Sequence, residues 1–238
     1  MPNQSKYLGL LVCGMIHMLL IAGCADGPFF EMKKANPYFR KQWEEDRALG
    51  PTFDDRMNEM QLLRSQISQM DAEEQRRWLE SLEKIFANDP SPDMRRQVAM
   101  ACATIQDPKA FMLLQKAAQD DSDKVRLAAC KSLAKQNTSE ALALIGKIAT
   151  TDESTSVRVA AINAISNYEG EEAKRWLAKT IQDRSPSIQY QSTVSLAKVT
   201  GENLGGDVAL WKRYLNGEAV EGPKATLADQ MGSMLKLR

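Results

Sequence analysis

Residues 120–133, DDSDKVRLAACKSL, contain the pattern that decides the fold of this chain. Asp120 lies five residues before Val125, and Ala129 and Leu133 follow that valine at intervals of four residues. Side chains four and eight residues apart share one face of an α-helix. The stretch therefore predicts a helix that buries a stripe of small and apolar side chains, with an acidic residue just before it.

The same pattern occurs four times along the chain, at spacings of 31, 32 and 31 residues. The aligned apolar positions are Met94, Val125, Val157 and Ile188. Five residues before them lie Asp89, Asp120, Asp152 and Asp183, and one residue after them lie Arg95, Arg126, Arg158 and Gln189. Helix-starting residues between these segments predict a second set of helices, which begin at Asp107-Pro108, at Thr138 or Ser139, and at Gly170. A register that is kept four times indicates a row of helical pairs that pack on one another.

A helical pair about every 31 residues, with Asp-x₄-(Val/Ile/Met)-Arg between its helices, resembles HEAT repeats of the short type first described in phycobilin lyases. The resemblance covers about residues 71–218 and implies an all-α fold, a right-handed α-solenoid of about four short helical pairs. In that family the aspartates and arginines form a ladder of hydrogen bonds between repeats. The ladder residues implied here are Asp89, Arg95, Asp120, Arg126, Asp152, Arg158 and Asp183. Because Gln189 carries no charge, we expect the ladder to weaken at the last repeat.

The resemblance also implies that the arginine-bearing helices form the inner wall of the solenoid. From Met94 to Ile105, and in the three equivalent segments, the sequence contains no aspartate or glutamate. A mildly basic wall with apolar patches suits a protein or peptide partner, such as an extended peptide or an acidic segment laid along it. The candidate partner-binding residues lie two, six and ten positions after the aligned starts: Arg96, Met100, Leu127, Lys131, Lys135, Val159, Asn163, Tyr190, Val194 and Lys198. Under the alternative interpretation, Leu127 and Val159 pack inward and the basic residues are ordinary solvated surface.

The N-terminal stretch is typical of a bacterial lipoprotein signal. Lys6 is followed by 17 residues without a charge, Tyr7 to Gly23, and a membrane-spanning helix needs about 20 apolar residues. The end of this stretch, LIAGC, resembles the lipobox, so we expect cleavage before Cys24 and attachment of lipid to its thiol. An uncleaved anchor helix is the alternative, and both readings place the protein on a membrane. By resemblance, Ala25 after the cysteine favours the outer membrane, facing the periplasm.

Several kinds of chemistry find little support in the composition. The one histidine, His17, lies inside the expected signal, so the expected mature chain has no imidazole for a catalytic triad or a histidine-based metal site. Lys+Arg and Asp+Glu both number 31, and this balance gives no reason to expect a nucleic-acid partner. Acidic pairs such as Glu171-Glu172 stand at expected helix starts, where capping explains them. We therefore expect no catalytic residue, no metal and no cofactor.

The remaining expectations concern organisation and function. The chain divides into a signal peptide (1–23), an aromatic and proline-rich connector (24–54), the repeat region (55–218) and a tail or capping helix (219–238). Three tryptophans, Trp78, Trp176 and Trp211, are expected in the core. Cys102 and Cys130 read as buried thiols, with a disulfide left open. The expected function is a membrane-anchored scaffold that binds a protein or peptide at the bacterial cell envelope. The alternative is a lyase-like enzyme, or an enzyme's accessory subunit, that acts on a bound small molecule.

Overall fold

The computed structural model describes residues 36–48 and 50–222, and the chain forms two compact units, residues 1–56 and 57–238. In the first unit, helix α3 (Pro37–Ala48) lies within the expected connector. Helix α4 (Phe53–Gln66) runs across the boundary between the units. The expected signal, Cys24 and most of the expected C-terminal tail lie outside the described residues.

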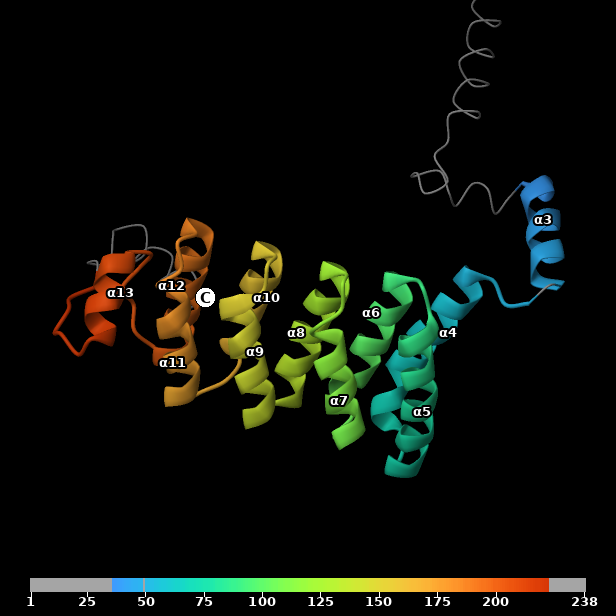
Figure 1. Cartoon of the computed structure of the whole chain (residues 1–238), viewed down its shortest axis with the longest axis horizontal. Coiled ribbons are helices and arrows are strands. Elements are labelled where there is room, and N and C mark those ends of the chain that lie inside the picture. Colours follow the sequence, from blue (N-terminus) through green and yellow to red (C-terminus); the bar gives the residue numbers. More distant parts are fainter. Residues whose placement is uncertain (1–35, 49, 223–238) are drawn as a thin grey trace, which may run out of the picture. The chain divides into compact units, whose positions relative to one another are not determined.

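The second unit consists of two rows of helices (Figure 1). One row, the Arg-helix row, contains α6 (Pro92–Ala101), α8 (Asp123–Gln136), α10 (Thr155–Ile165) and α12 (Pro186–Thr200). The other, the outer row, contains α5 (Ala72–Asn88), α7 (Pro108–Ala117), α9 (Ser139–Thr151) and α11 (Glu171–Thr180). Two 3₁₀ turns, η1 (Ile67–Gln69) and η2 (Cys102–Thr104), precede α5 and follow α6, and α13 (Val208–Leu215) ends the row. Every regular element within the described residues is a helix, which confirms the all-α prediction.

The helices begin where the sequence supplies capping groups. The carboxylate of Asp71 accepts the N–H groups of Glu73 and Glu74 and completes a capping box at the start of α5. Asp107 caps α7, whose first residue is a proline, and the hydroxyl of Thr138 caps α9. These contacts satisfy amide groups that have no partner inside the helix. The predicted helix starts are confirmed.

The core follows the repeat register. The residues at the aligned positions, and those four and eight places later, are all at most 1% exposed: Met94, Val98, Cys102, Val125, Ala129, Leu133, Val157, Ala161, Ile165, Ile188, Ser192 and Leu196. Small side chains at the middle position let neighbouring helices approach closely, so one continuous core joins the pairs.

Both cysteines of the repeat region are buried, and both thiols are free. Burial raises the pKa of the Cys102 thiol to about 12. Burial, with a smaller contribution from the nearby Asp152 charge, raises the pKa of the Cys130 thiol to about 12 as well. Both side chains therefore behave as small apolar groups at neutral pH.

The three tryptophans lie in different environments. Trp211 is fully buried and donates its indole N–H to the carbonyl of Gly205 at 2.8 Å. Trp176 is half-buried and lies against Gly146 of α9. The prediction that Trp78 lies in the core is wrong, because its side chain is 41% exposed. The buried residues of α5 are Leu79 and Leu82, and Trp78 stands at the edge of that stripe.

Candidate partner-binding face

Ion pairs link each repeat to the next one along the Arg-helix row. Arg95 donates from Nε and Nη2 to the two carboxylate oxygens of Asp120, at 2.7 and 2.9 Å. Arg126 makes the same bidentate contact with Asp152, with Nε and Nη2 donating to the two carboxylate oxygens at 2.9 and 3.2 Å. These are charge-assisted bonds in the geometry that suits a guanidinium best. The first two steps of the ladder are therefore closed by paired bonds.

The ladder loosens toward the C-terminal end. Arg158 Nε lies 3.7 Å from the nearest Asp183 oxygen and makes no hydrogen bond within the described structure. At the next repeat Gln189 donates to the backbone carbonyl of Asp183 at 2.8 Å. Arg126 makes the equivalent bond to the carbonyl of Asp120 at 2.9 Å. Gln189 thus keeps the hydrogen bond within its own repeat. Because it is uncharged, it cannot form an ion pair with another repeat.

Two further sets of contacts escaped the sequence analysis. Each ladder aspartate accepts the backbone N–H of the serine two residues later, over 2.7–2.9 Å: Ser91, Ser122, Ser154 and Ser185. The repeated Asp-x-Ser is a signal that could have revealed this turn. Near the C-terminal ends of α8 and α10, side chains donate hydrogen bonds back to the preceding repeat. Gln136 donates to the carbonyl of Cys102 at 2.8 Å, and Tyr168 Oη donates to that of Leu133 at 2.9 Å.

The candidate partner-binding residues lie at corresponding positions on α6, α8, α10 and α12, and we call this surface the Arg-helix face. All ten are half-exposed or exposed. Tyr190 and Val194, one turn apart on α12, are 61% and 46% exposed. Met100, Leu127 and Val159 are partly buried against the core, so part of the alternative interpretation also holds. The face therefore combines apolar side chains with accessible polar ones.

Carboxylates take little part in the polar contacts of this face. Lys198 Nζ donates to the side-chain oxygen of Asn167 at 2.9 Å, and Gln191 donates to Asn163. Lys131 and Lys135 are exposed on α8. Arg96 lies 3.5 Å from Asp93 of its own helix. The face keeps its positive charge because it holds no carboxylate beyond the first turn of each helix.

One basic residue near this face escaped the sequence analysis. Arg64 of α4 donates from Nη1 to the side-chain oxygen of the buried Gln97 at 2.6 Å. Burial, together with the positive charge of Arg96, lowers the pKa of Arg64. The signal was present in the sequence, since the buried Leu63 and Ile67 lie 31 residues before Met94 and Val98.

Comparison with known protein families identifies the middle of this arrangement. Residues 79–158, from the second half of α5 to the start of α10, match the model of a family described as HEAT repeats. This segment consists of HEAT repeats. A search of curated proteins finds no match to the chain. In the structure, the buried positions of the HEAT repeats continue in the same register through α12.

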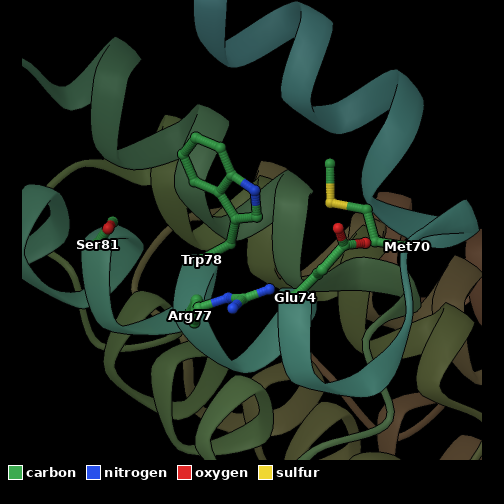
Figure 2. A pocket seen from close by; sticks show the side chains of 5 residues that line it. All are labelled: Met70, Glu74, Arg77, Trp78 and Ser81. Atoms are coloured by element: carbon green, nitrogen blue, oxygen red, sulfur yellow. The ribbon is translucent and has the colours of Figure 1, made fainter.

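The hollows around the HEAT repeats are open and mixed in charge. A hollow of about 310 Å³ at α5 is lined by Met70, Glu74, Arg77, Trp78 and Ser81. Figure 2 shows Glu74 projecting from α5 toward Met70, with the indole of Trp78 beside them and Ser81 apart. This hollow has one acidic and one basic side chain, and it lacks the carboxylate pair that acid–base catalysis would use.

A larger hollow, of about 510 Å³, lies between α7 and α9 and contains four carboxylates. Two of them, Asp120 and Asp152, are ladder residues held by Arg95 and Arg126. Asp121 and Glu153 are exposed at its rim. The carboxylates of this hollow thus have a structural explanation. Within the described residues, no cluster of His, Cys, Asp and Glu is arranged to hold a metal ion.

Over residues 36–48 and 50–222, no helix is both long and apolar enough to cross a bilayer.

Because of the ladder, the free energy of unfolding of the HEAT repeats should depend on pH. Burial by itself raises the pKa of Asp120, but hydrogen bonds from Arg95 and the Ser122 N–H, with the charges of Arg95 and Arg126, bring it below its ordinary value. A carboxyl group whose pKa is lower in the folded state stabilises that state above the unfolded pKa, about 3.9. This contribution is lost as the pH falls through the folded pKa.

We therefore expect the stability difference between the wild type and Asp120→Asn to be large near neutral pH and to shrink below about pH 4. Urea unfolding at a series of pH values measures this difference. The exposed neighbour Asp121 provides the control, because Asp121→Asn leaves the ion pair with Arg95 intact. A constant difference between wild type and Asp120→Asn at all pH values would contradict this assignment.

Proposed function

We propose that this protein is a membrane-anchored HEAT-repeat scaffold that binds a protein or peptide partner along the Arg-helix face, at the bacterial cell envelope. One observation carries the proposal: four consecutively packed helices present corresponding exposed positions with apolar and basic side chains and no carboxylate among them. HEAT repeats are solenoids, and their stacked helices commonly form long binding surfaces. The partner contacts are those of the candidate residues named above.

Membrane attachment rests on the sequence LIAGC at residues 20–24. Acyl chains on Cys24 would hold the protein on the membrane, with each buried methylene contributing about 0.8 kcal/mol. The residue after the cysteine favours the outer membrane, facing the periplasm. The open hollows with mixed charge favour a scaffold over an enzyme that encloses a small molecule.

Cross-linking in intact cells, followed by mass spectrometry of the captured proteins, tests the role of the face. The test variant carries Tyr190→Asp and Val194→Asp, because both side chains are exposed and their replacement spares the core. The matched control is Met112→Asp on α7, an equally exposed apolar residue of the outer row. Circular dichroism checks that all forms keep their helices.

We expect the wild type and the Met112→Asp control to capture the same partner and the double variant to lose it. Equal capture by all three would contradict binding at the Arg-helix face. The same cells test the anchor, since the wild type should incorporate labelled fatty acid and Cys24→Ser should not. A wild type that stays in the membrane fraction without incorporating the label would support the uncleaved anchor helix instead.

A further inference from the structure

We propose that the Arg-helix face is bipartite and that its occupant is an extended, acidic segment of a partner protein. At one end, Arg64 and Arg96 bind a carboxylate of that segment. At the other end, Tyr190 and Val194 bind an apolar side chain about eight residues away. This inference rests on the proposed function and specifies the chemistry, length and polarity of the partner.

The first end holds two guanidinium groups with little counter-charge. Arg64 is fixed by its 2.6 Å bond to Gln97, the residue next to Arg96. The Nε of Arg96 is buried and has no hydrogen-bond partner within the described structure. The ion pair of Arg96 with Asp93 is a half-exposed contact within one helix, at 3.5 Å, and pairs of this kind contribute little. A carboxylate placed against the exposed parts of both guanidinium groups would relieve their repulsion and pair with both of them.

The middle of the face is also positively charged. Lys131 and Lys135 are exposed on α8. The outer row handles its basic residues differently, since acids on neighbouring helices pair with several of them. Those pairs are Arg76–Asp107, Lys109–Glu80 and Lys116–Glu83. The four described helices of the Arg-helix row carry no carboxylate beyond their first turn, so the positive charge is available to an acidic partner.

The α12 end of the face presents exposed apolar side chains. Tyr190 and Val194 are the two most exposed apolar residues of the Arg-helix row. They lie four residues apart on α12, so their side chains share one surface of the helix. An aromatic ring beside an aliphatic side chain is a common anchor for an apolar group of a partner. This end therefore selects for an apolar residue, and the first end selects for an acid.

The distance between the two ends sets the length of the segment. Three interhelical steps separate α6 from α12, through α8 and α10. Packed helices lie about 8–10 Å apart, which makes the span roughly 24–30 Å. An extended chain advances about 3.3 Å per residue. The acid and the apolar residue of the partner should therefore be separated by about seven to nine residues.

Charge distinguishes this occupant from the chain's own C-terminal segment. Residues 223–238 contain Lys224, Lys236 and Arg238 but only one acid, Asp229. A segment with excess positive charge is repelled by a basic face. An anionic bilayer has suitable charge, but it has no fixed spacing between an acid and an apolar group, so it would not require both ends of the face.

Selection from a displayed library of random twelve-residue peptides tests the inference, with the full-length chain in detergent as the target. Three variants accompany the wild type: Arg64→Gln with Arg96→Gln, Tyr190→Ala with Val194→Ala, and Met112→Ala as the outer-row control. Synthetic copies of the enriched peptides are then measured by fluorescence anisotropy at low and high salt. Vesicles containing phosphatidylglycerol form a separate arm.

We expect the wild type and the control to enrich peptides with an acid and an apolar residue about seven to nine positions apart. The paired arginine substitutions should weaken binding of these peptides about ten-fold or more and reduce its salt dependence. The substitutions on α12 should remove the preference for the apolar residue. No enrichment, enrichment without acids, or binding that is unaffected by the arginine substitutions would overturn the inference. Binding of vesicles but not of peptides, lost on arginine substitution, would assign the face to lipid and overturn it too. If cells still show a partner that depends on Tyr190 and Val194, the proposed function stands while this inference fails.

Discussion

Replacing Arg126 by methionine should lower the free energy of unfolding by about 3–5 kcal/mol. The side chains of Arg126 and Asp152 are only 8% and 7% exposed, and their two carboxylate bonds are accompanied by bonds to the carbonyls of Asp120 and Asp121. Methionine has a similar length but leaves the Asp152 carboxylate buried without its counter-charge. Urea denaturation followed by circular dichroism measures the loss.

The same substitution at the other arginines provides the controls. Arg158→Met should cost less, because Arg158 and Asp183 are 3.7 Å apart and the carboxylate is 24% exposed. Arg95→Met should fall between the two, since Arg95 is 18% exposed in its pair with Asp120. Adding Asp152→Asn to Arg126→Met should recover part of the stability by removing the unpaired charge. Equal losses at all three arginines would show that burial does not set the strength of the ladder.

Replacing Gly146 by alanine should destabilise the protein by about 2 kcal/mol, although alanine is the better helix former by about 1 kcal/mol. Gly146 lies inside α9, and a Cβ atom at this position would overlap Cγ, Cδ2 and Cε2 of the Trp176 indole. The overlap involves the body of the ring, so the whole indole must move. Its packing between α9 and α11, and the contact of Lys179 Nζ at 4.1 Å from the ring centre, would then be lost. Thermal unfolding measures the change.

The control is the reverse substitution at an open site of the same helix. Ala143 is exposed on α9, so Ala143→Gly should cost only the difference in helix propensity, about 1 kcal/mol. The double variant Gly146→Ala with Trp176→Ala should be less destabilised than the sum of its single changes, because the smaller side chain removes the overlap. A stabilising effect of Gly146→Ala in the wild-type background would show that the indole does not depend on this glycine.

The repeat register and the helix starts could be predicted because both depend on local chemistry. Burial of every fourth residue produces the pattern that aligns Met94, Val125, Val157 and Ile188, and short polar side chains such as Asp107 and Thr138 mark the amides that they cap. The spacing of the aspartates and arginines is visible in the repeat, and their role as a ladder is implied by the resemblance to HEAT repeats. The Arg–Asp distances differ from one repeat junction to the next. They depend on how neighbouring helical pairs pack, and the spacing in the sequence does not contain that information.

Two of the contacts that escaped prediction join a side chain to the backbone of another repeat. Gln136 and Tyr168 bind carbonyl groups, and any residue type supplies a carbonyl, so no pattern of side chains reveals these partners. Trp78 was misplaced for a related reason, because an apolar side chain at the edge of a buried stripe looks like a member of it. Tyr190 was placed on the face by its register alone.

The unequal steps of the ladder also determine how the protein bends. The junctions from α6 to α8 and from α8 to α10 are each clamped by a two-pronged ion pair and by a backward bond from Gln136 or Tyr168. The junction from α10 to α12 has the looser Arg158–Asp183 pair, and its backward bonds are a 3.3 Å bond from Ser195 to the carbonyl of Ile162 and exposed side-chain contacts of Gln191 and Lys198. Elastic deformation should concentrate there, so that the first three pairs behave as a stiff rod and the α12 end as a compliant tip. Such a tip would let Tyr190 and Val194 follow ligands of slightly different length while the arginine end stays in place.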